Sequence, residues 1–218
     1  MNAASERLFV AVLIVVLIGA GGSACAGDAV LANGVFLVAK PELLDPNFRE
    51  TVVLITEPEV GGGPMGVIVN RPLDVRLTDA LPGFPEVPAR LDQLYGGGPV
   101  APNQLLLLVR SAWAPARSLQ VLADVYLSGD AELLQSIARG AARVESWRVY
   151  AGYSGWAPGQ LQSEIARGGW YVVPADADVI FAEQPANVWP ELIKRIATRS
   201  TRAVPLAPEA RAIATSAR

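Results

Sequence analysis

The chain has 218 residues, of which 51% are hydrophobic and 18% charged, and its formal net charge is −3. This length and composition fit one domain with a hydrophobic core, and the net charge excludes a globally basic nucleic-acid-binding protein. The absence of histidine excludes Ser-His-Asp and Cys-His triads and most zinc and non-haem iron sites. We therefore expect no cofactor and no metal site.

The first 26 residues are predicted to be a signal peptide or an anchor. A continuous apolar run from Leu8 to Ala20 follows Arg7 and precedes small residues, as is typical of a signal peptide. The sequence Ala24-Cys25-Ala26 fits cleavage after Ala26, whereas lipidation at Cys25 is the second alternative. An uncleaved anchor or a misassigned start is the third. Cleavage or lipidation predicts a periplasmic or membrane-anchored protein, and a misassigned start predicts a cytoplasmic one. Membrane contact is expected only through this segment.

The first half of the remaining chain is rich in predicted strands. A short helix is expected to begin at Thr78 and to end at the prolines that follow. Apolar and β-branched runs predict strands at Val35 to Ala39, Thr51 to Thr56, Gly66 to Asn70, Gln104 to Arg110, Ser118 to Leu122 and Val125 to Leu127.

The second half alternates predicted helices and strands. One helix opens at Ser128-Gly129-Asp130 and closes at Gly140, and another has Pro158 at its first position. A last helix carries apolar residues from Trp189 to Ile196 at helical spacing. Strands are expected at Trp147 to Ala151, Trp170 to Val173 and Val179 to Phe181. We place one domain at residues 31–197 and a disordered tail at 198–218, where arginine, alanine and serine predominate.

Two motifs resemble catalytic or cofactor signatures but favour structural roles. Residues Gly61 to Gly66 match G-x-G-x-x-G, yet the β-branched run that follows favours a hairpin loop over a dinucleotide site. The segment Gly152-Tyr153-Ser154-Gly155 has its second glycine one place too early for a nucleophile elbow, and no histidine is available as its base. The glycines here favour a tight turn.

Polar residues suited to ligand binding occur at two places. The pair Asn70-Arg71 offers an amide and a guanidinium to a carboxylate or phosphate, although an ion pair of Arg71 with Asp74 or Asp45 is an alternative. The glycines from Gly96 to Gly98 form either an anion-binding loop or a simple turn. The loop carboxylates have no spacing that forces two of them together; they are Asp45, Glu57, Asp74, Asp124 and Asp176.

Five motifs in order closely resemble the YqgE/AlgH family of bacterial proteins over residues 31–197. They are Asp45-Pro46-x-Phe48, Met65-Gly66-x-x-x-Asn70-Arg71-Pro72, Tyr95-x-Gly97-Gly98-Pro99-Val100, the segment from Gly152 to Glu164, and the segment from Trp170 to Trp189. The resemblance implies an α+β fold in which a bifurcated sheet folds into a pseudo-barrel with flanking helices. It also implies a family without an established activity, in which a member named as a regulator of alginate synthesis genes has led to transcriptional-regulator labels. Relatives commonly carry histidine where this chain has Arg110.

These observations favour a non-enzymatic binding or regulatory domain that takes a small anionic ligand or a protein partner and no nucleic acid. A transcriptional regulator and a carboxylate- or metal-dependent hydrolase are the alternatives, and we predict no catalytic residue and no metal ligand. One candidate cleft is expected to be lined by Asn70, Arg71, Gly97, Gly98, Tyr153, Trp156 and Gln160.

Overall fold

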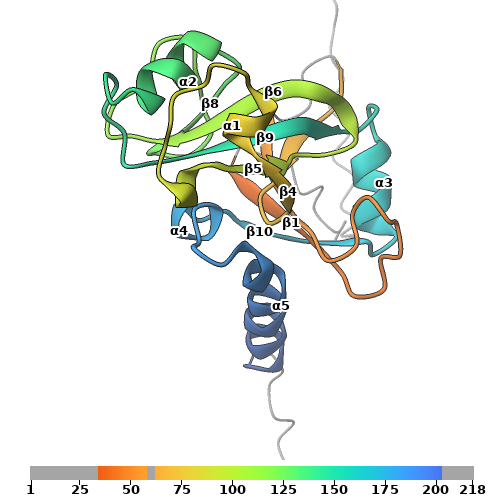
Figure 1. Cartoon of the computed structure of the whole chain (residues 1–218). Coiled ribbons are helices and arrows are strands. Elements are labelled where there is room, and N and C mark those ends of the chain that lie inside the picture. The colour runs from red at the N-terminus through yellow and green to blue at the C-terminus, as the bar shows by residue number, and fades with distance from the viewer. Residues whose placement is uncertain (1–33, 58–61, 203–218) are drawn as a thin grey trace, which may run out of the picture. The chain divides into compact units, whose positions relative to one another are not determined.

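The computed structural model describes residues 34–57 and 62–202, which form one curled, mostly antiparallel sheet flanked by helices (Figure 1). The sheet forms a half-barrel, so the predicted α+β fold is confirmed. The strands are β1 (Val35–Ala39), β2 (Val52–Glu57), β3 (Met65–Ile68), β4 (Pro72–Arg76), β5 (Gln93–Gly96), β6 (Val100–Arg110), β7 (Leu119–Gln120), β8 (Val125–Ser128), β9 (Ser146–Gly155) and β10 (Trp170–Pro174). The helices are α1 (Leu77–Ala80), the 3-10 helix η1 (Ala89–Leu91), α2 (Ala131–Ala138), α3 (Gln160–Ala166), α4 (Ala177–Ile180) and α5 (Pro185–Arg202).

The sheet branches at β9. The end of this strand pairs with β3, and its first part pairs antiparallel with β6 and parallel with β5. The main path runs β10-β1-β2-β3-β9-β6-β8-β7, and β4 joins through β5. A single strand therefore connects the two parts of the sheet, which makes the packing around β9 decisive for the fold.

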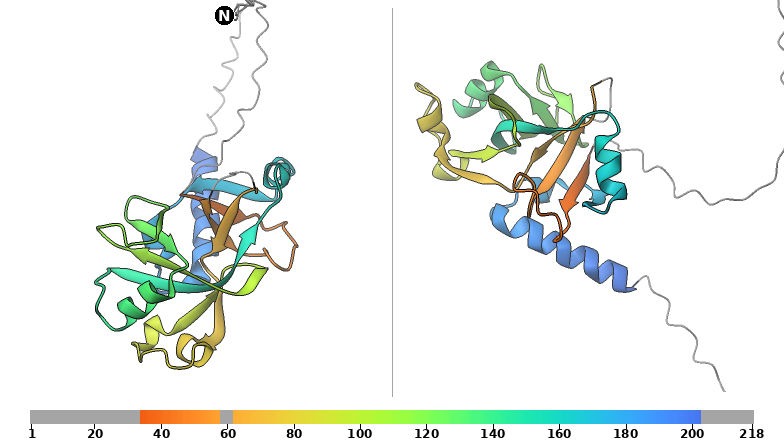
Figure 2. Two further views of the ribbon diagram at one scale, coloured as in Figure 1. Left: turned by 90° about the horizontal axis from the view of Figure 1, so that it is seen from above. Right: turned by 90° about the vertical axis from the view of Figure 1, so that its right-hand side faces the viewer.

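Side chains of the central strands alternate between two hydrophobic cores. Val52 and Leu54 of β2 share one core with Val188 of α5, whereas Val53 and Ile55 share another with the helix α3. Because successive side chains of a strand point to opposite faces, α5 and α3 cover opposite faces of this part of the sheet. Figure 2 shows the two helices on separate sides, with α5 along the bottom of the right-hand view. Burial on both faces explains why β1 and β2 are continuously apolar.

A third core lies beneath α2. Leu134 and Ile137 of that helix pack with Leu107 of β6 and Val149 of β9. The Asp130 carboxylate begins the helix by accepting a hydrogen bond from the Glu132 main-chain N–H at 2.9 Å. This is the helix start that the Ser-Gly-Asp sequence predicts.

The structure corrects one predicted strand and the start of one helix, because α3 begins at Gln160 after its N-cap Gly159 and not at Pro158. The expected strand from Val179 to Phe181 is wrong: this segment ends α4, which the Asp176 carboxylate caps by accepting from the Asp178 N–H at 2.9 Å. The strands β4 and β5 lie where the sequence pattern predicted no strand. Helix α5 continues past residue 197 to Arg202. The leader with Cys25 and the tail from residue 203 lie outside the described residues. Among residues 34–57 and 62–202, no helix has the length and apolar character to cross a bilayer.

Candidate functional site

A groove of about 350 Å³ opens where the chain leaves β3 and passes the start of α5. We call it the Arg71 groove. It is lined by two predicted residues, Asn70 and Arg71, together with Arg49, Glu50, Thr51, Ala186, Trp189 and Pro190. Segments far apart in the sequence thus meet at one place on the surface.

Asn70 builds one wall of the groove, and both polar atoms of its side chain already bond to the backbone. Its Oδ1 accepts a hydrogen bond from the Val52 N–H at 2.8 Å, and its Nδ2 donates to the Glu50 carbonyl at 3.0 Å. These bonds hold the segment before β2, in which Glu50 has the left-handed φ of 57°. Asn70 therefore positions Arg49 and Glu50 beside Arg71.

Arg71 is the residue of the groove whose charged side chain has no bonding partner among the described residues. Its side chain is partly buried, and this burial lowers the pKa of its guanidinium. Within residues 34–57 and 62–202 it forms no ion pair and no side-chain hydrogen bond, so the predicted pairing with Asp74 or Asp45 does not occur. A cation that loses hydration without gaining a counter-charge is destabilised, and an anion in the groove would relieve that cost.

Gly96 and Trp189 set the position of the Arg71 side chain and the shape of the groove. A Cβ atom on Gly96 would lie 3.4 Å from Cδ of Arg71, so the glycine leaves room for the arginine stem. The Trp189 indole N–H donates to the Ala39 carbonyl at 2.7 Å, which fixes the ring as an apolar wall. With Arg49 and Glu50, both exposed, the groove carries two guanidinium groups and one carboxylate.

Gly97 and Gly98 lie at the junction of the sheet and not in an anion-binding loop. The Gly97 N–H donates to the Ala151 carbonyl at 2.9 Å, and the Gly97 carbonyl accepts from the Ile68 N–H at 2.9 Å and from the Ser154 hydroxyl at 3.1 Å. A Cβ atom on Gly97 would lie 2.2 Å from the Gly152 carbonyl oxygen. These glycines are required because two backbones approach closely.

Trp156 and Gln160 belong to a cluster on the opposite face of the sheet. The Glu164 carboxylate accepts from the indole N–H groups of Trp156 at 3.1 Å and Trp170 at 3.0 Å, and from the Gln160 amide at 3.0 Å. Phe48 stacks on Trp156 with ring centroids 5.8 Å apart. The ring of Trp156 is buried, so the cluster anchors α3 to the sheet.

The structure does not bring the seven predicted residues into one cleft. Asn70 and Arg71 line the Arg71 groove, whereas Trp156 and Gln160 lie with α3, and the glycines with the partly buried Tyr153 lie at the β9 junction. Sequence reasoning missed Arg49 and Trp189 as lining residues. Arg49 directly follows the first quoted motif and Trp189 ends the last one, but only the fold shows that both line the groove with Arg71.

Four of the residues considered for catalysis make structural contacts; they are Ser154, Asp124, Asp176 and Asp45. The Ser154 side chain is fully buried, and its hydroxyl donates to the Gly97 carbonyl. Asp124 accepts from Arg110 Nε at 2.7 Å, Asp176 caps α4, and Asp45 accepts from the Asn47 N–H at 2.8 Å. In the part of the chain that the structure describes, no three acidic or cysteine residues gather as a metal site would require.

Comparisons with known proteins agree on one family. The AlgH-like family model matches residues 36–201. A UPF0301 protein of Methylococcus capsulatus is 38% identical over 74% of this chain and 90% of its own length. A UPF0301 protein of Chlamydia felis is 34% identical over 76% of this chain and 87% of its own. The solution structure of the AlgH protein from Pseudomonas aeruginosa superposes with a TM-score of 0.65 at 28% identity, over 85% of this chain and all of that one. A crystal structure from Corynebacterium diphtheriae gives a TM-score of 0.64 at 27% identity, over 76% of this chain and 87% of that one.

Proposed function

The chain belongs to the AlgH-like family, for which no specific activity is established, and we propose that it is a non-enzymatic binding domain whose Arg71 groove takes a small anion. The observation that carries the proposal is the partly buried guanidinium of Arg71, which forms no ion pair with any described residue. The groove supplies Arg49 as a second cation.

The chemistry of the groove favours a carboxylate or phosphate ligand. A guanidinium binds either group through two parallel charge-assisted hydrogen bonds. Trp189 and Pro190 add an apolar wall on which an attached hydrocarbon part of the ligand can pack. Asn70, already engaged with the backbone, contributes rigidity to the site.

Titration of the purified full chain with inorganic phosphate and, separately, with acetate tests this proposal by calorimetry. We expect Arg71→Gln to weaken binding of the preferred anion at least about tenfold, because a hydrogen bond to a charged group contributes about 1.5–3 kcal/mol. Arg90→Gln, which removes an exposed arginine of η1 outside the groove, should leave the affinity unchanged.

Two results would count against an anion site here. One is equal affinity in the parent chain and Arg71→Gln, which would place any binding elsewhere. The other is an equal loss in Arg71→Gln and Arg90→Gln, which would indicate attraction by net charge alone.

We also propose that the domain is exported, on the basis of the apolar run from Leu8 to Ala20 and the small residues after it. Mass spectrometry of the protein from fractionated cells should find a mature N-terminus at Gly27, or a lipidated Cys25. Intact Met1 in the cytosolic fraction would contradict export.

A further inference from the structure

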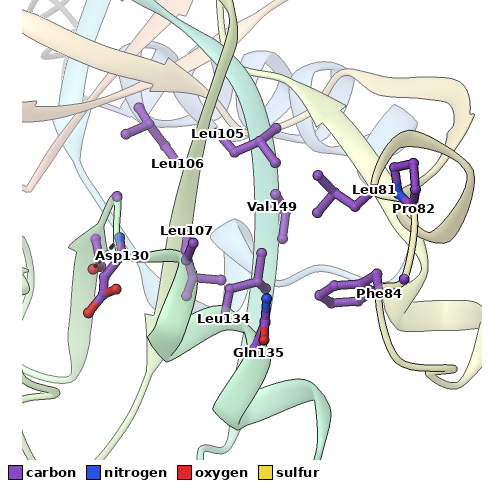
Figure 3. A pocket seen from close by; sticks show the side chains of 14 residues that line it. Leu81, Pro82, Phe84, Leu105, Leu106, Leu107, Asp130, Leu134, Gln135 and Val149 are labelled. Atoms are coloured by element: carbon purple, nitrogen blue, oxygen red, sulfur yellow. Dashed lines mark hydrogen bonds between the residues drawn. The ribbon is translucent and has the colours of Figure 1, made fainter.

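A second pocket, of about 200 Å³, lies between α2, the loop after α1, and strands β6 and β9 (Figure 3). It shares no lining residue with the Arg71 groove. Figure 3 shows Leu81 and Phe84 projecting from the loop toward Val149 and Leu134. Its lining is mainly apolar and includes Leu81, Phe84, Leu105, Leu107, Leu134 and Val149.

Two polar side chains of the lining, those of Asp130 and Ser128, already have partners. The Asp130 carboxylate accepts from the Glu132 N–H at 2.9 Å and pairs with Arg117 Nε at 3.1 Å. The Ser128 hydroxyl donates to the Arg117 carbonyl at 2.8 Å and accepts from the Asp130 N–H at 3.1 Å. A ligand in the pocket would therefore meet mostly hydrocarbon, with the exposed Gln135 beside Phe84.

The size and charge of the pocket define the chemistry of its occupant. Protein cores leave few voids larger than a water molecule, and an apolar cavity of about 150 Å³ stays dry and takes up benzene in another protein. Asp130 is the one charged residue of the lining, and its carboxylate is paired with Arg117, so the lining offers an anion no cation. Burying an ammonium among leucines is costly as well. We propose that this pocket binds an uncharged ligand group, namely one aromatic ring with a short substituent.

Three probes with one ring test the proposal on the full chain: benzyl alcohol, benzoate and benzylamine. In ¹H–¹⁵N spectra we expect benzyl alcohol to shift the amides of residues 81, 83–84, 105–107 and 130–135, with millimolar or tighter affinity. The two charged probes should bind there at least about tenfold more weakly. Benzoate shifts at the Arg71 groove would bear on the separate anion proposal and not on this one.

A variant that fills the pocket provides the second measurement. Ala131 lines the pocket at the start of α2, and Ala131→Phe should weaken benzyl alcohol binding at least about tenfold. Ala141→Phe, which places the same ring at an exposed position outside the lining, should leave it unchanged. Benzyl alcohol shifts confined to other regions, unchanged affinity in a folded Ala131→Phe, or equal binding of all three probes in the pocket would overturn the proposal. If Ala131→Phe fails to fold, the map of shifts on the parent chain decides.

Discussion

Gly97→Ala should cost more than about 3 kcal/mol of folding stability or prevent folding altogether. The added Cβ would lie 2.2 Å from the Gly152 carbonyl oxygen and 3.2 Å from Cβ of Tyr150. The closest atom is backbone of β9, which also pairs with β3, β5 and β6 and cannot shift without loss of those contacts. Urea denaturation followed by tryptophan fluorescence measures the effect.

Gly129→Ala is the matched control for this substitution. A Cβ at Gly129 meets no atom within 4 Å, and its φ lies outside the left-handed region. We expect its free energy of unfolding to stay within about 0.5 kcal/mol of the parent value. Similar urea midpoints for Gly97→Ala and Gly129→Ala would show that the backbone around Gly97 is less tightly packed than these distances indicate.

Arg148→Met is expected to destabilise the domain by about 2–4 kcal/mol and to loosen α5 from the sheet. The Arg148 guanidinium donates to the carbonyl of Ile180, the last residue of α4, at 2.6 Å and to the carbonyl of Ala182 just beyond the helix. It also lies 4.6 Å from the centroid of the Tyr95 ring. Methionine fills much of the same space, but it leaves the acceptors without their donors, and each unsatisfied buried group costs about 1–3 kcal/mol.

Hydrogen exchange separates this local effect from a general one. Amides of α5 should exchange faster in Arg148→Met relative to those of β6, because α4 leads directly into α5. Arg139→Met, at the exposed end of α2, should change neither stability nor exchange appreciably. Unchanged protection of α5 in Arg148→Met would mean that the arginine does not hold the helix in place.

Local sequence pattern was sufficient to predict a strand or helix where the segment is buried on both faces or carries a clear helix cap. The runs of β1 and β2 are apolar throughout because α3 and α5 cover both sides of them. The sequence pattern does not predict β4 because most of its residues are exposed. It does not predict β5 because this strand has only four residues and pairs with the distant β9. The segment after Asp176 has strand-like residues, but the carboxylate cap makes it helical.

The candidate site was only partly predictable because tertiary contacts decide which polar residues meet. Asn70 and Arg71 stood out by their chemistry, yet Trp189 joins them across more than a hundred residues of chain. Trp156 and Gln160 lie in a conspicuous motif, but no local pattern shows that they pack on the face opposite to α5. The glycine sequence left an anion-binding loop open as the alternative to a simple turn, and only the fold shows the close approach of β9.

A crystal of the full chain soaked in sodium selenate tests the Arg71 groove most directly, because selenate is a tetrahedral anion with an anomalous signal. We predict a selenium peak in the groove, with selenate oxygens about 2.7–3.2 Å from the Arg71 guanidinium nitrogens. An empty groove in which the Arg71 guanidinium is paired with a carboxylate of its own chain would contradict an anion site there.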